Sequence, residues 1–230
     1  MKSDNKCVLF IMKQHQKGES MMNIEGIEME VRCTGDVCSD ALEFLRRHNH
    51  EKTAEHSIRV KQAAERLANR FHVPAQKAGI AGMMHDISGV IPNEKRIAAA
   101  EALGIDILPE ERIFPMIIHQ KLSKVMARDL FQVADQDILD AIECHTTLKE
   151  NPSQLDLVLF SADKIEWDQT GTPPYIKELH EALEISLEHG AFVYIQYLWK
   201  QKDKLKVVHP WLKDAYYHLK AIIEACPQAK

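Results

Sequence analysis

Apolar side chains recur every three to four positions through most of the chain after Ser39, which is the spacing of amphipathic helices. The longest stretch of this kind covers residues 51–71. On a helix it places these side chains on one face: His56, Val60, Ala63, Ala64, Leu67 and Ala68. The pattern therefore predicts a long helix whose apolar face packs on the core, with His56 pointing the same way.

Cap and turn residues divide the remaining apolar stretches into further helices. Ser39 or Asp40 can cap the first of them. The helix from Gln154 is apolar almost all round, which is typical of a central buried helix, and it ends at Asp163. Other helices are expected to start near Pro74, Asn93, His119 and Asp135, and the last three are expected near residues 176–189, 191–204 and 211–225. The pattern predicts an all-α helical bundle for residues 39–230.

The first 38 residues have a different texture. Ile27, Met29 and Val31 alternate with charged residues, and this period of two predicts a strand. We expect residues 1–38 to form an N-terminal arm, which is either a short strand pair or a disordered segment. As a strand pair, the arm can cover the body of the protein or contact a partner.

Charge and cysteine content narrow the class of protein. The 230 residues include 29 basic and 34 acidic side chains, for a net charge of -5, with no block of Lys or Arg. A nucleic-acid partner is therefore not expected, whereas a small phosphorylated ligand is allowed. The 5 cysteines lack a C-x-x-C spacing, which favours a cytoplasmic location. The apolar run Cys7 to Met12 is too short for a signal peptide or a membrane span, so no membrane association is expected.

Histidines and aspartates stand where the predicted helices begin or end. In chain order they are His56, His85, Asp86, His119, His145 and Asp163. Imidazole nitrogen and carboxylate oxygen together suit iron, manganese or zinc. Asp86 and Asp163 lie on apolar helices, where a buried charge requires a partner or a metal. We therefore predict that these six residues bind one or two divalent transition-metal ions.

The strings around these residues resemble the HD-domain phosphohydrolase superfamily. The matching segments are Glu55-His56-Ser57, Ala78 to Asp86, His145-Thr146-Thr147 and Ala162-Asp163-Lys164-Ile165-Glu166. They are most similar to the bacterial YqeK-type proteins, which hydrolyse diadenosine tetraphosphate symmetrically to two ADP. The resemblance runs from about Asp40 to the C-terminus and implies an HD-domain helical bundle. It also implies that iron is held by His56, His85, Asp86 and Asp163, with His119 and His145 on the phosphate side.

Three positions depart from that family. Thr53 stands where the family has an arginine three residues before the first histidine, and Leu148 replaces a glycine. Gln169 replaces an arginine that contacts phosphate in the family. The two missing cations weaken the expectation of a substrate that spans four phosphates.

Substrate contacts are expected from the groups that remain near the centre. They are Thr53, His119, His145, Thr146, Lys164, Gln169 and Tyr216. Lys164 is the nearest candidate cation for a phosphate, although an ion pair to Glu166 or Asp168 explains it equally well. Tyr216 lies in the last helix, which in the family closes over the nucleoside.

The function predicted from these residues is metal-dependent hydrolysis of a phosphoanhydride or phosphoester bond in a nucleotide or a related small molecule, with diadenosine tetraphosphate as one candidate. Asp86, His119 and His145 are the candidate catalytic residues. With two ions, Asp86 bridges them and the two histidines complete the second set. With one ion, the histidines donate to phosphate. A nucleoside-monophosphate phosphatase, a cyclic-nucleotide phosphodiesterase and a non-catalytic nucleotide sensor remain alternatives, and a homodimer is left open.

Overall fold

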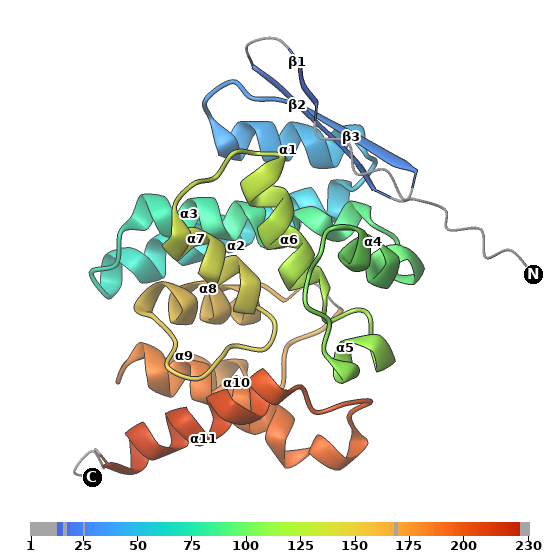
Figure 1. The fold of residues 1–230 in the computed structure, drawn as a ribbon. Coiled ribbons are helices and arrows are strands. Elements are labelled where there is room, and N and C mark those ends of the chain that lie inside the picture. The colour runs from blue at the N-terminus through green and yellow to red at the C-terminus, as the bar shows by residue number, and fades with distance from the viewer. Residues whose placement is uncertain (1–12, 16–17, 25, 168–169, 226–230) are drawn as a thin grey trace, which may run out of the picture.

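The computed structural model describes residues 13–15, 18–24, 26–167 and 170–225. These residues form a small antiparallel sheet at one end and a stack of helices below it (Figure 1). The sheet has the order β1-β2-β3, with β1 at Lys13–His15, β2 at Glu19–Ile24 and β3 at Ile27–Arg32. Its register pairs Met22 with Met29 and Ser20 with Val31. Within the described part of the chain, no helix is long and apolar enough to cross a membrane.

The predicted all-α bundle is confirmed. Its helices are α1 Val37–Arg47, α2 Glu51–Arg70, α3 Ala75–Met84, α4 Arg96–Ala102, α5 Pro109–Ile113, α6 His119–Asp129, α7 Gln136–Cys144, α8 Gln154–Ile165, α9 Ile176–Leu183, α10 Leu187–Lys200 and α11 Pro210–Ala225. Three short 3-10 segments connect them, at Ile87–Val90, Asn93–Lys95 and Lys202–Lys204. Helix α8 packs against α2, α3, α7 and α10, which gives it the central position that its apolar sequence predicted.

The sheet packs on the bundle through one apolar face. Alternate residues of β2 and β3 are buried, among them Met22 and Met29, and they belong to the same core as Phe44 of α1. Ser20 of β2 accepts a hydrogen bond from Gln132, which follows α6. The alternation at residues 27–31 thus forms a strand, as expected, and of the two alternatives for the arm the described residues adopt the strand form. The prediction for residues 1–12 lies outside the described residues.

Two helix boundaries differ from the sequence prediction. The first helix is capped by Asp36, whose carboxylate accepts from the amides of Cys38 and Ser39. Asp40, which with Ser39 was one of the two predicted caps, is buried one turn later and accepts from the amide and hydroxyl of Thr34. Asp36, three residues before Ser39 and four before Asp40, is an equally good acceptor in the sequence, and only the backbone path decides which residue caps the helix.

The second difference is the division between α9 and α10. The sequence placed it next to Gly190, but α9 ends at Leu183 and Ser186 caps α10 by accepting from the amide of His189. Gly190 lies inside α10, where a Cβ would lie 2.4 Å from Cδ2 of Leu183. This glycine allows the two helices to approach closely, so it is a packing residue and not a helix breaker.

A buried polar network ties α5, α6 and the start of α11 together, and the sequence pattern did not indicate it. The carboxylate of Glu111, which is fully buried, accepts from Lys121 Nζ at 2.9 Å and from the amide of Leu108 at 2.8 Å. His209 Nε2 lies 3.3 Å from its other oxygen. Burial raises the pKa of Glu111, but the bonds from His209, Leu108 and Lys121 outweigh it, so that the pKa lies below its usual range.

We expect Glu111→Gln to lower the free energy of unfolding by about 3 kcal/mol, because it leaves Lys121 charged, buried and without its anion. Urea unfolding at pH 7 measures this. The matched variant Glu111→Gln/Lys121→Met should recover part of the loss.

The same carboxylate makes stability depend on pH, because the pKa of Glu111 is lower in the folded protein than in the unfolded chain. It stabilises the fold above about pH 4.3, the pKa in the unfolded chain, and this contribution disappears as the pH falls through the pKa in the folded protein. A single variant as stable as the unmodified protein would contradict this role.

Candidate metal centre

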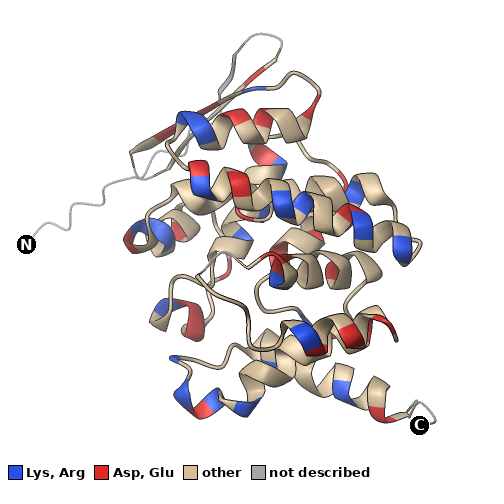
Figure 2. Ribbon diagram, turned by 180° about the vertical axis from the view of Figure 1, so that it is seen from behind, with Lys and Arg blue, Asp and Glu red and all other residues tan. Residues whose placement is uncertain are grey.

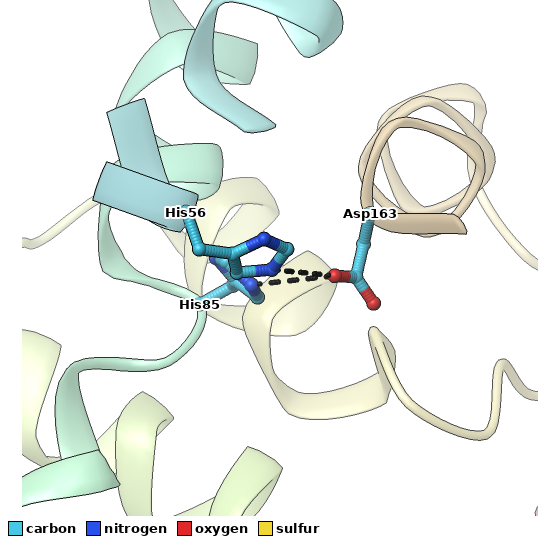
Figure 3. Close-up of side chains that lie close together, drawn as sticks. All are labelled: His56, His85 and Asp163. Carbon is cyan, nitrogen blue, oxygen red and sulfur yellow. Dashed lines mark hydrogen bonds and ion pairs between the residues drawn. The ribbon is translucent and has the colours of Figure 1, made fainter. Parts of the chain in front are cut away.

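Four helices that pack against one another, α2, α3, α7 and α8, and the start of a fifth, α6, bring the predicted ligands to the middle of the bundle. His56 lies in the second turn of α2, His85 directly follows α3, and Asp163 lies near the end of α8. In Figure 3 the imidazole of His56 lies in front of that of His85, and both rings face the carboxylate of Asp163; the two ring centroids are 5.2 Å apart. Gly82 permits this approach of α3 to α2, since a Cβ there would lie 2.8 Å from Cα of Lys61. Residue 82, three positions before His85, is therefore a glycine because two helix backbones meet there.

The first group of candidate ligands is His56, His85 and Asp163, whose ligand atoms lie within 4.8 Å of one another. Asp163 Oδ1 is 3.1 Å from His56 Nε2 and 3.5 Å from His85 Nε2. Asp86 joins this group through Oδ2, which lies 3.4 Å from His85 Nε2. Asp86 is thus linked to the first group through His85.

The second group shares Asp86 with the first. Oδ1 of Asp86 lies 3.1 Å from His119 Nε2 and 3.5 Å from His145 Nε2. His119 is the first residue of α6, and His145 directly follows α7. The hydroxyl of Ser88 donates to the backbone carbonyl of His119 at 2.9 Å, which fixes the segment after Asp86 against α6. Asp86 is therefore the one described carboxylate in contact with both groups.

Three of the histidines are oriented in the same way. In each ring Nδ1 bonds a backbone carbonyl three residues earlier: His85 to Gly82 at 2.8 Å, His119 to Met116 at 2.6 Å and His145 to Ile142 at 2.8 Å. We assign the proton to Nδ1, which leaves the lone pair of Nε2 directed at the centre. His85 Nε2 is buried without a hydrogen-bond partner among the described residues. An imidazole held in this tautomer is prepared to bind a metal ion.

The contact between His119 and His145 leads to the same conclusion. Their Nε2 atoms lie 3.0 Å apart, and with Nδ1 as the donor in both rings neither of them carries a proton. Two acceptors at this distance require a shared proton or a cation between them. The hydroxyl of Thr146 lies 3.2 and 3.1 Å from the same two atoms, so it can donate to only one of them at a time.

The electrostatics of the centre favour a positive charge. Burial raises the pKa of Asp86 and of Asp163. Three neighbouring imidazoles hold the pKa of Asp86 well below its usual range, and Lys164 with two imidazoles does the same for Asp163. Burial lowers the pKa of His85, yet the two carboxylates raise it to about 9, so without an ion its Nε2 also carries a proton, which a bound ion would replace. Burial lowers the pKa of His145 to about 4, with His119 adding to this effect. Two ionised carboxylates in a buried site need a cation, and imidazole with carboxylate is a donor set for divalent iron, manganese or zinc.

The residues present therefore fit a divalent metal, and they come from the positions predicted for it.

The residues predicted from the sequence to contact the substrate lie in different surroundings. Thr146 lies at the centre, as described above. Thr53 borders a pocket of about 290 Å³ that also reaches His56 and Asp86. Gln169 lies outside the described residues.

Lys164 does not form the ion pair to Glu166 that the sequence allowed, and the other allowed partner, Asp168, lies outside the described residues. Its Nζ donates to Asp163 Oδ2 at 2.5 Å and to the carbonyl of His145 at 3.4 Å. Glu166, the predicted ion-pair partner, instead contacts Arg59 and Arg66. Lys164 is thus a buried cation that orients a ligand carboxylate, because α8 turns it toward the centre.

Tyr216 is not among the residues brought together at the centre. Its ring stacks on Trp199, with centroids 4.4 Å apart, and packs against Phe192 of α10. The aromatic side chain serves the packing of α11 on α10. The proposed contact of Tyr216 with a nucleoside accordingly has no support among its observed contacts.

Other groups at the centre gave no signal in the sequence pattern. Gln120 is buried and accepts from the amide of Thr146 at 3.1 Å while donating to the hydroxyl of Thr147. It fixes the turn that carries His145. A second, apolar pocket of about 180 Å³ begins at these two threonines and continues along Tyr194, His209 and Leu212. The position of Gln120 directly after His119 was the only feature of the sequence that indicated its place near the centre.

These features define a helical protein of the metal-dependent hydrolase class. A family model described as HD domain matches residues 53–168, which is half of the chain and includes all six candidate ligands. The chain therefore belongs to the HD domain family. The prediction of a metal-dependent phosphohydrolase is confirmed at the level of this class.

Known proteins agree with this assignment. The chain is 52% identical over 147 residues to an uncharacterized protein in the pepC 5' region of Lactococcus lactis subsp. cremoris, a match that covers 64% of this chain and 74% of that protein. It is 30% identical over 153 residues to a symmetrical bis(5'-nucleosyl)-tetraphosphatase of Bacillus subtilis, covering 66% and 80% of the two chains. A solved structure of a predicted HD superfamily hydrolase involved in NAD metabolism from Clostridium acetobutylicum superposes with a TM-score of 0.74 at 28% identity, over 80% and 97% of the chains.

Proposed function

We propose that this chain hydrolyses a phosphoanhydride or phosphoester bond of a nucleotide at the centre around Asp86. One observation carries the proposal: Asp86 contacts His85 through one oxygen and the pair His119 and His145 through the other. One pocket reaches Asp86, and a second begins at Thr146, next to His145 in the chain. A carboxylate that serves two ligand groups can position an attacking water and the phosphate at once. The tetraphosphatase from Bacillus subtilis supports a nucleotide as the substrate.

Each residue has a separate task in the proposed reaction. His56, His85, Asp86 and Asp163 would hold the ion, which we propose to be iron, with manganese or zinc as the alternatives. When bound, the ion lowers the pKa of a water molecule and neutralises charge on the phosphoryl oxygens. His119 and His145 face the phosphate from the other side of Asp86, and Thr146 donates a hydrogen bond there. His145 is neutral at pH 7 because its pKa is about 4, so it acts as a ligand or an acceptor.

The apolar pocket beyond Thr146 and Thr147 suits a nucleobase. Its walls include Phe114, Tyr194 and Leu198, and the volume of about 180 Å³ is small. His209 borders the pocket and is held by Glu111. We propose that the base or nucleoside enters on this side and that the phosphate lies at the two histidines.

The surface charges support a small-molecule partner. Figure 2 shows Lys and Arg interspersed with Asp and Glu along the helices of the face that it presents. Such a mixture gives no track for a phosphate backbone. Three statements stay predictions: that the protein has no nucleic-acid partner, that it is located in the cytoplasm, and that it forms a homodimer. The cytoplasmic location agrees with the free cysteines Cys33, Cys38 and Cys144.

The substrate is tested with a nucleotide panel on protein loaded with iron or manganese. We expect diadenosine tetraphosphate to be cleaved with a raised KM, because Thr53 and Gln169 stand where cations are expected. Gln169→Arg should lower this KM by about tenfold or more, since a charge-assisted bond to phosphate contributes about 1.5–3 kcal/mol. Gln169→Leu is the control without charge. A low-micromolar KM of the unmodified protein that the arginine does not change would refute this substrate argument, and cleavage of nucleoside monophosphates alone would favour that alternative.

A further inference from the structure

A polar pocket of about 290 Å³ opens beside the metal centre on the side of α2. It is lined by Lys52, Thr53, Glu55, His56, Arg59 and Asp86. Two of these residues, His56 and Asp86, are candidate metal ligands, so an anion in the pocket would lie next to the ion. The other four are polar or charged, which distinguishes this pocket from the apolar one at Thr146.

Arg59 is placed to bind an anion there. It follows His56 by three positions on α2, so both side chains lie on neighbouring parts of one helix face. Its side chain is 44% exposed, and among the described residues its ion pair is a long one, Nε to Glu166 Oε2 at 3.6 Å. Neither of the two Nη groups donates a hydrogen bond within the described part of the chain. The guanidinium thus borders the pocket with most of its donors available.

A guanidinium fork matches the geometry of a phosphate better than the single ammonium of Lys52 does. The pocket lies on the His56 side of Asp86, whereas the histidines assigned to the reacting phosphate lie on the other side. We propose that Arg59 binds a second phosphate of the substrate, beyond the one that is attacked. This rests on the proposed function and narrows it to nucleotides with at least two phosphate groups. Arg59 also supplies a cation next to the neutral Thr53.

Steady-state kinetics with diadenosine tetraphosphate and ADP test the role of Arg59. Arg59→Met should raise KM by about tenfold or more with little change in kcat, because the bond is made equally in the bound substrate and in the transition state. The KM of Arg59→Lys should lie between that of the unmodified protein and that of Arg59→Met. The matched control is Arg66→Met: Arg66 contacts the same Glu166 at 3.4 Å but does not line the pocket. An equal rise of KM in Arg66→Met, or a rise only in Lys52→Met, overturns the proposal.

Binding measurements separate this inference from the proposed function. Isothermal titration of pyrophosphate and of orthophosphate into manganese-loaded protein needs no turnover. Arg59→Met should weaken the binding of pyrophosphate by about tenfold or more and the binding of orthophosphate by much less. Thr53→Arg in the same chain should restore pyrophosphate binding, because residue 53 borders the same pocket. If no nucleotide is hydrolysed, the proposed function fails while this result still decides on Arg59. Unchanged pyrophosphate affinity in Arg59→Met, or no pyrophosphate binding by the unmodified protein, overturns the inference.

Discussion

Replacing Asp86 with alanine is expected to reduce hydrolysis by on the order of a thousandfold or more, because one side chain serves both ligand groups. Its two oxygens contact His85 on one side and His119 and His145 on the other. The carboxylate contributes to the site more than to the packing, so the helical circular dichroism should stay close to that of the unmodified protein. Turnover of the best nucleotide in the panel measures the effect.

Asp86→Asn is the informative companion to this variant. It keeps the size and one acceptor oxygen but removes the charge, so it separates shape from electrostatics. We expect it to be nearly as inactive as Asp86→Ala, with less metal bound by elemental analysis. Asp156→Asn is a control of the same type away from the centre, since Asp156 is buried and paired with Lys149. Retained turnover in Asp86→Ala, or loss of structure as its only effect, would contradict the role assigned to this carboxylate.

Removal of the metal is expected to have the second large effect. Protein prepared without chelator should carry iron, manganese or zinc at about one or two ions per chain. The ion would join α2, the end of α3 and α8 through His56, His85 and Asp163. A ligand present at a thousand times its dissociation constant stabilises a fold by about 4 kcal/mol. For a chain of this size that corresponds to a fall of about 10 °C in the melting temperature on chelation.

The measurement is calorimetric melting before and after chelator, followed by reconstitution with each metal. Asp163→Asn should melt at the same temperature with and without chelator, because its first ligand group is incomplete. This variant distinguishes loss of the ion from a direct effect of the chelator. A protein that contains no metal as purified and that gains neither stability nor turnover on reconstitution would remove the metal hypothesis.

The extent to which the sequence predicted the fold depends on the range of the interactions concerned. Two helix starts with a local cap were found to within a residue: Asp135 accepts from the amides of Asp137 and Ile138, and Ser153 accepts from that of Asp156. The start capped by Asp36 was missed, because several neighbouring residues could accept the same bonds. Such bonds span two or three residues, so the local sequence is sufficient to predict them. The boundary at Gly190 failed because a glycine that breaks a helix and one that permits close packing look the same without the neighbouring helix.

The candidate ligands could also be named from the sequence, whereas the partners of the charged side chains around them could not. The order of His56, His85-Asp86, His119, His145 and Asp163 predicted one centre, since each stands at or near a helix end. The partners of long charged side chains depend on which helices meet. Lys164 could equally have reached Glu166, yet it contacts Asp163, and Glu166 contacts Arg59.

The sequence by itself therefore determined the helical bundle, the alternating strand at residues 27–31 and the six candidate ligands, because periodicity, caps and residue chemistry are local properties. Only the tertiary structure decided that Asp86 is shared by two ligand groups and that Arg59 borders a polar pocket next to them. It also decided that Tyr216 packs on Trp199 and that Glu111 joins Lys121 to His209. These contacts join residues far apart in the chain, and their formation depends on how the helices pack against one another.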